Sequence, residues 1–169
     1  VQDRQSSIVV DESKVAPVFP LTAEIQGATG IPKKNWNVEI AEERFMSSGI
    51  TASVLGSILD ASVNERRDVT WKLTSKLTVR GHGTIPLEDF GVATGGMPDA
   101  SELAHAKISR AVGEVLNNPW ENAHIEKVEA TFTVDYSREL NRIRGIDVLD
   151  PVVDVGQNVR IRVHLVPFV

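Results

Sequence analysis

The sequence has 169 residues, of which 41% are hydrophobic and 24% charged, and its net charge is -5 at pH 7. These values fit one soluble domain able to bury about 70% of its unfolded surface. The acidic balance argues against a nucleic-acid partner, which normally selects a basic surface. Having no cysteine, the chain has no disulfide, thiol chemistry or zinc–thiolate site. Its sequence also has no apolar run near the ~20 residues of a membrane span.

The first part of the chain predicts a strand pair. Residues 1–16 rise from polar to apolar and back, which fits a short edge strand or an arm. Apolar and polar residues then alternate over Val18–Gln26, and Pro20 favours an edge position for this strand. The glycines and proline of Gly27–Lys34 predict a turn. The alternation of Trp36–Ile40 predicts the hairpin partner.

A helix and a second strand pair are expected next. Ser47–Gly49 is a plausible helix start, and apolar residues at every fourth position predict a helix over Ile50–Val63. Val69–Val79 alternates as a long strand. Thr84–Leu87 predicts a short strand, and Gly91–Pro98 a flexible loop.

The third block contains the clearest strand of the sequence. Asp99 and Glu102 form a capping-box pattern ahead of a helix expected over Ala100–Leu116, and Asn117–Pro119 predicts its end. Ile125–Tyr136 then alternates strictly, which indicates a long strand with one buried and one wet face.

The last block predicts two more strands. Leu140–Leu149 is a weaker strand interrupted at Gly145, and Asp150–Gly156 is a turn region. Val159–Leu165 alternates cleanly between apolar and polar residues.

Together these patterns predict a single α+β domain over residues 1–169, with about six mainly antiparallel strands and two packed helices. Alternating strands favour an antiparallel sheet with one wet face. We expect the two helices to cover the apolar side of this sheet. The three strands expected in its middle are Val69–Val79, Val128–Tyr136 and Val159–Leu165.

His82, between two glycines, is the first candidate for chemistry. It could act as a general base or a ligand, although a turn that needs glycine freedom explains the pattern more simply. A hydrolase using His82 with Asp89 is one functional alternative. Glu88 and Asp89 make a poor catalytic pair, because neighbouring strand residues face opposite ways. The four histidines lack metal-binding spacing, so neither a metal nor another cofactor is expected.

Arg160 and Arg162 are candidates for anion binding on the wet face of the last strand. If that strand neighbours the central one, the simpler expectation is that they pair with Glu129 and Asp135 across the sheet.

Trp120 is the aromatic residue most suited to a binding role. Trp36 and Trp71 are in phase with the apolar sides of their strands, so both are expected in the core, whereas Trp120 follows a helix stop. A glycan- or peptide-binding module centred on Trp120 and the Gly91–Pro98 loop is the second functional alternative.

Several short stretches also carry a family resemblance. They are DRQSSI (Asp3–Ile8), PVFPLT (Pro17–Thr22), LTVRGHGTIPLEDF (Leu77–Phe90), LNNPWE (Leu116–Glu121), IEKV (Ile125–Val128), and the ending from Val155–Val159 to Leu165–Phe168. These stretches resemble the segment that follows the peptidase domain in exported bacterial proteins of the SpoIVB serine peptidase type.

The resemblance implies an accessory role. Catalysis in such proteins belongs to an upstream domain with a glycine-flanked serine and a histidine, and residues 1–10 resemble the tail of that domain. No catalytic residue is carried over to this chain. The implied partners are the upstream peptidase-like domain or envelope proteins, and the implied location is the periplasm, cell envelope or exterior. The start at Val1, without an initiator Met, leads us to expect a part of a longer protein.

Overall fold

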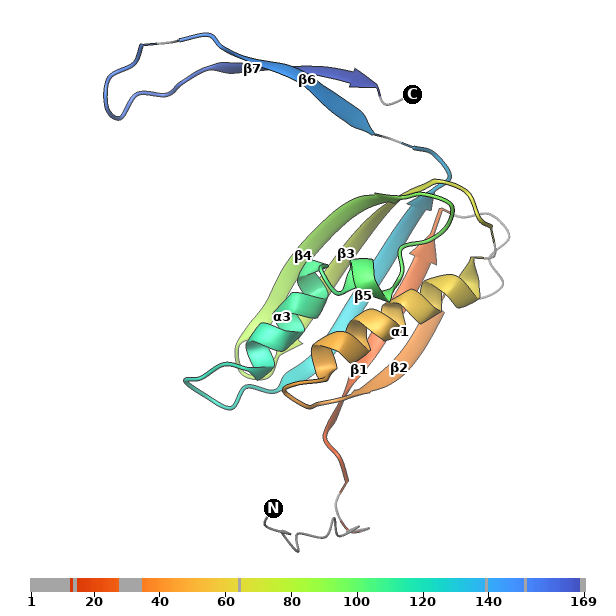
Figure 1. Cartoon of the computed structure of the whole chain (residues 1–169). Coiled ribbons are helices and arrows are strands. Elements are labelled where there is room, and N and C mark those ends of the chain that lie inside the picture. The colour runs from red at the N-terminus through yellow and green to blue at the C-terminus, as the bar shows by residue number, and fades with distance from the viewer. Residues whose placement is uncertain are drawn as a thin grey trace, which may run out of the picture.

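The computed structural model describes residues 13, 15–27, 35–63, 65–138, 140–150 and 152–167. They form a body of five strands and three helices, from which a two-stranded hairpin extends (Figure 1). The elements in chain order are β1 (Val18–Gln26), β2 (Asn35–Ala41), α1 (Ser47–Ser62), β3 (Val69–Val79), β4 (Gly83–Ala93), α2 (Ala100–Leu103), α3 (Lys107–Leu116), β5 (Ile125–Asp135), β6 (Asn141–Val148) and β7 (Ile161–Pro167). The predicted mainly antiparallel α+β fold is confirmed. Two predicted segments lie mostly outside the described residues: the N-terminal segment of residues 1–16, and the turn predicted after β1.

The body is one sheet in the order β2-β1-β5-β3-β4. All neighbouring strands are antiparallel except β1 and β5, which run parallel. Strand β5, whose burial alternates from Val128 onward, is therefore central, with Phe132 fully buried opposite Ile25 on one side and Leu73 on the other. Alternation places its threonines and charges on the other, solvent-facing side.

Helices α1 and α3 lie on the apolar face of this sheet (Figure 1). Leu55 and Leu59 of α1 are fully buried, as are Ile108 and Val112 of α3. Trp36 and Trp71 are both predicted to lie in the core. The prediction is confirmed for Trp71, which is buried.

Trp36 is half-buried against the core and donates a hydrogen bond from Nε1 to Ser62 Oγ at 3.0 Å.

The helix predicted over Ala100–Leu116 is wrong in one respect, because it is broken into α2 and α3. Asp99 caps α2 by accepting hydrogen bonds from the backbone N–H groups of Ser101 and Glu102. The chain then leaves the helix after Leu103, and a second cap starts α3. That cap is the Asp89 carboxylate of β4, which accepts from the Lys107 N–H at 3.0 and 3.1 Å.

The fourth strand is longer than Thr84–Leu87 predicted. It runs over Gly83–Ala93 and so takes in the start of the expected Gly91–Pro98 loop. Gly91 fits here because a Cβ at this position would lie 2.5 Å from the Trp71 ring. Since β4 is an edge strand and mostly exposed, it lacks the clear alternation of the inner strands.

The expectation that Val159–Leu165 lies in the middle of the main sheet is wrong. This segment contributes β7, which pairs only with β6 among the described strands. A register shift between Ile143 and Gly145 interrupts the pairing. The sequence break predicted at Gly145 is therefore a β-bulge.

Candidate functional site

We call the hairpin of residues 141–167 the arm. Its two strands contact each other and make few contacts with the body (Figure 1). The chain just before the arm is held to the body. Thr70 Oγ1 donates to the Ser137 carbonyl at 2.9 Å, Arg138 lies 3.7 Å from Asp68, and the Arg67 guanidinium stacks 4.4 Å from the Tyr136 ring centre. The arm therefore leaves the body from a fixed base.

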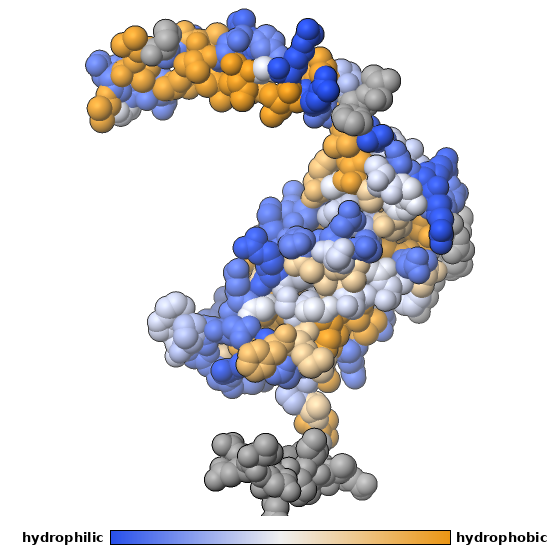
Figure 2. Space-filling view, in the orientation of Figure 1, coloured by the Kyte–Doolittle hydropathy of each residue, from blue (hydrophilic) through white to orange (hydrophobic). Residues whose placement is uncertain are grey.

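One side of the arm is apolar, and we call it the apolar face of the arm. Cross-strand pairs place these residues together, because antiparallel partners share a face and the bulge after Ile143 brings Ile146 onto the same side. The six members of this face are Ile143, Ile146, Val148, Ile161, Val163 and Leu165. Their side chains are 42–58% exposed. In Figure 2 much of the arm is correspondingly coloured as hydrophobic.

The other side of the arm is polar and carries Arg160, Arg162 and His164. Arg160 forms a two-pronged salt bridge with Asp150, at 2.8 and 2.9 Å, and this bond holds the pKa of the Asp150 carboxyl below its ordinary value. His164 Nε2 lies 2.7 Å from Asp147.

Arg162 lies opposite Asp147 in the register. The expected pairing of the two arginines with Glu129 and Asp135 is therefore wrong. Both of those acids lie on β5 in the body, and Glu129 is bound to Lys127 at 3.0 Å.

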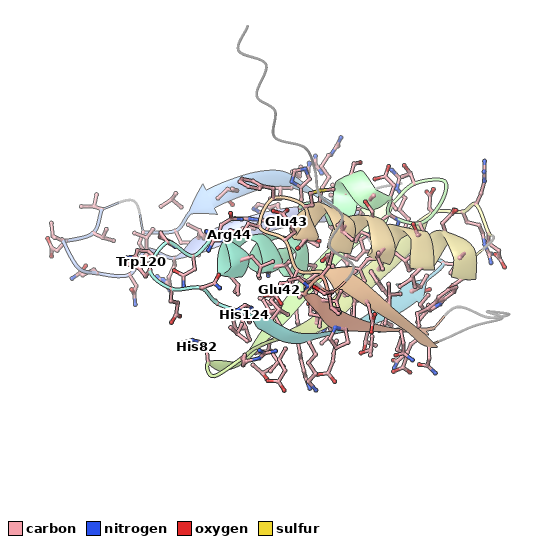
Figure 3. All side chains as sticks on the ribbon, turned by 90° about the horizontal axis from the view of Figure 1, so that it is seen from below. Glu42, Glu43, Arg44, His82, Trp120 and His124 are labelled. Atoms are coloured by element: carbon pink, nitrogen blue, oxygen red, sulfur yellow. The ribbon has the colours of Figure 1, made fainter. Side chains whose placement is uncertain are left out.

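Trp120 is presented by the loop between α3 and β5. Its side chain is 90% exposed. The Trp120 backbone N–H donates to Asn118 Oδ1. The Asn117 side-chain amide donates to the Arg44 carbonyl at 3.0 Å, and it caps α3 by donating to the Gly113 carbonyl. Asn117 ends the helix through this side-chain bond, without adopting a left-handed backbone. The loop is thus attached to the segment ahead of α1, with the Trp120 ring outside (Figure 3).

Two acid–histidine pairs lie beside the Trp120 loop. His82, in the β3–β4 turn, lies 3.2 Å from Glu121. His124 Nδ1 lies 2.6 Å from Glu42, whose side chain is only 9% exposed, and Figure 3 shows these two residues side by side. Glu42 and His124 are 82 positions apart, so sequence patterns gave no sign of this pair. The His82–Glu121 contact joins the Trp120 loop to the β3–β4 turn, and the His124–Glu42 contact joins the end of this loop to the segment between β2 and α1.

The structure does not form the pair that a hydrolase using His82 and Asp89 needs. His82 pairs with Glu121 in the turn, whereas Asp89 caps α3 from the middle of β4. Asp89 and Glu88 face opposite sides of their strand, as expected from alternation. The three side chains therefore have separate structural partners.

The proposed combination of Trp120 with the Gly91–Pro98 loop is also wrong in its geometry. Gly95–Pro98 line a hollow of about 580 Å³ together with the C-terminal half of α1. Trp120 lies on the loop after α3, at the opposite end of the body (Figure 1). The two segments therefore do not form one site.

A further concave surface lies between α1 and the edge strand β2. We call it the α1–β2 groove. It has a volume of about 730 Å³ and a mainly apolar lining, in which Ser53 and Ser57 are the polar side chains. Trp36 and Val38 form the β2 side, Ile50 and Val54 the helix side, and Phe45 and Met46 the end. Phe45 is 88% exposed and Met46 61% exposed.

No family model, curated protein or solved structure matches this chain. The resemblance to SpoIVB-type proteins therefore stays a prediction. In the part of the chain that the structure describes, no helix has the length and hydrophobicity needed to cross a membrane. Within those same residues, no three His, Asp or Glu side chains gather as metal ligands.

Proposed function

We propose that this chain is a non-catalytic accessory domain of an exported SpoIVB-type peptidase-like protein, and that its arm is the docking surface for a protein partner. The resemblance implies that this partner is the peptidase-like region or an envelope protein. The observation that carries the proposal is the apolar face of the arm, where six aliphatic side chains are each at least 42% exposed.

An arm of this kind is poorly suited to standing alone in water. A two-stranded hairpin is marginally stable without a third strand or a packed helix. A contiguous exposed apolar patch is also typical of an interaction site. Docking would bury the apolar face and leave the salt bridges of Arg160 and His164 on the wet side. Binding would therefore complete the packing that the arm lacks.

The two side chains first considered for catalysis, His82 and Asp89, each have a local partner that fixes a turn or a helix end. His164 likewise has a partner across the two strands of the arm. These contacts are structural, and they hold the surfaces around the arm and the Trp120 loop in place.

The test measures access to the apolar face of the arm. Because the chain contains no cysteine, Val163→Cys places a single new thiol on that face. In the full-length parent protein we expect this thiol to react with an alkylating reagent at least about tenfold more slowly than in the dilute isolated chain. Mass spectrometry would identify the modified site. Val152→Cys, at the 90% exposed tip of the arm, is the matched control and should react at similar rates in both proteins. Equal reactivity of Val163→Cys in both would contradict the proposal.

A second candidate function is a glycan- or peptide-binding module, favoured by the 90% exposure of Trp120. Exposed aromatic rings offer a stacking surface for sugars and apolar side chains. Titration with cell-envelope glycan fragments and short peptides should then change tryptophan fluorescence, and Trp120→Ala should remove the change. If no such ligand alters the fluorescence of the unmodified chain, this candidate is rejected.

A further inference from the structure

The two edge strands of the body sheet differ in how well they are protected against pairing with a further strand. On β4, Pro86 interrupts the edge and the Lys107 ammonium donates to the Glu88 carbonyl at 2.7 Å. The other edge is β2, with the sequence NWNVEIA, which contains neither proline nor lysine and has Glu39 as its single charge. Among the described strands, β2 pairs only with β1. An unguarded edge of this kind is a template for another strand.

The α1–β2 groove lies beside that unguarded edge. Trp36 and Val38 are on the helix-facing side of β2, and Ile50 and Val54 of α1 form the facing wall. A strand added next to β2 would therefore direct every second side chain into the groove. This is the geometry of recognition by strand addition, in which main-chain bonds and side-chain pockets act together.

The arm has the features that this groove would select. Its strands have eight and seven residues, against seven in β2, and it has one apolar and one polar face like the body sheet. The polar face carries Arg142 and Arg162, and the polar face of β2 carries the exposed Glu39. Across the whole sequence, residues 141–169 contain four Arg and three Asp, whereas residues 1–140 contain 20 acidic and 14 basic residues. Charge and hydrophobicity are both complementary.

We infer that the α1–β2 groove binds the arm of a second copy of this chain, so that two copies exchange arms in a symmetric dimer. The inference rests on the proposed docking role of the arm, and it takes a second copy of this chain, in place of the peptidase-like region or an envelope protein, as the partner. Figure 1 shows the arm extending past the end of the body sheet, and no described residue of the arm lines the groove, so the groove of its own body stays open. Reciprocal exchange uses the same contact twice and closes the assembly.

The experiment measures self-association of the full chain by sedimentation equilibrium. The unmodified chain should form a dimer. Phe45→Asp in the groove and Val163→Asp on the arm should each weaken dimerisation at least about tenfold. Both side chains are exposed, so neither change removes a core contact. Phe90→Asp, at a 62% exposed phenylalanine on β4, is the matched control and should leave the dimer intact.

Mixing the two variants identifies the contact. The Val163→Asp chain keeps a normal groove, and the Phe45→Asp chain keeps a normal arm. Their mixture should therefore form a heterodimer at concentrations where neither variant associates with itself. A monomeric unmodified chain, a Phe45→Asp chain that dimerises normally, or a mixture without heterodimer would each overturn the inference. None of these results affects the thiol-access test of the arm in the parent protein, so the proposed function can survive failure of the dimer.

Discussion

At the residue scale, Gly27 shows how one position fixes the end of β1. Its backbone has φ 87°, and a Cβ there would collide with the Val134 carbonyl oxygen of β5. We predict that Gly27→Ala lowers the free energy of unfolding by about 1–3 kcal/mol, through backbone strain and overpacking. Urea denaturation followed by circular dichroism would measure the change.

The matched control is Gly49→Ala. Gly49 is exposed near the start of α1, and a Cβ there meets nothing within 4 Å. Replacing a helical glycine with alanine should raise the free energy of unfolding by about 0.5–1 kcal/mol. If Gly27→Ala leaves the urea midpoint unchanged or raises it, as Gly49→Ala should, the description of Gly27 is wrong.

Tyr136, the only tyrosine in the chain, reports on the base of the arm. Burial raises its pKa above the ordinary value of 10.0, and the nearby Glu65 carboxylate raises it further, while Arg67 acts in the opposite direction. We predict that tyrosinate absorbance titrates at a higher pH in the folded protein than in urea. Glu65→Gln should move the folded titration to lower pH, and Arg67→Gln should move it higher.

The raised pKa has a consequence for stability. A raised pKa means that the folded state favours neutral Tyr136, so this contribution to stability is fully present below the ordinary pKa and is lost as the pH rises through the folded value. A folded titration at or below the unfolded one would show that the Tyr136 ring is not packed at the base of the arm.

At the element scale, the start of α3 depends on the Asp89 cap. The carboxylate accepts the Lys107 N–H with both oxygens. We predict that Asp89→Ala lowers the free energy of unfolding by about 1 kcal/mol through loss of the cap. Glu88→Ala is the control: the exposed Glu88 carboxylate forms a surface salt bridge with Lys72, and its backbone carbonyl, which accepts from Lys107, is kept in the variant, so the expected change is within about 0.5 kcal/mol. Equal losses in urea denaturation would contradict the capping role.

The same cap shows why helix boundaries were only partly predictable. Asp99 lies directly before its helix, so local sequence predicted that cap correctly. Asp89 precedes Lys107 by 18 positions and reaches it only because β4 and α3 pack together. The break between α2 and α3 is therefore a tertiary feature, which an unbroken apolar periodicity over Ala100–Leu116 could not reveal.

At the scale of the whole molecule, alternation predicted strands well and their neighbours less well. Val69–Val79 and Ile125–Tyr136 alternate because one face is buried under helices, and both were correctly expected at the centre of the sheet. Val159–Leu165 alternates equally well, yet its apolar side is exposed in the arm. Periodicity reports that a face is apolar and not what covers it.

The candidate site was predictable to a similar extent. Trp120 was correctly singled out as the tryptophan outside the core. Arg160 and Arg162 were placed on a wet face, but their neighbours changed when β7 joined β6. The α1–β2 groove was missed, because its walls come from Phe45, Met46 and residues of two separate elements that only the fold brings together.

The central claim is that the apolar face of the arm is covered when the protein functions. Hydrogen–deuterium exchange of the β6 and β7 amides tests this claim most directly, because a marginal hairpin opens readily and a docked one does not. In the dilute isolated chain, we predict fast exchange in the arm and slow exchange in β5. In the longer parent protein that we propose, at working concentration, arm exchange should slow at least about tenfold while β5 stays slow. An arm that exchanges as fast in the parent protein as in the dilute chain would contradict the claim.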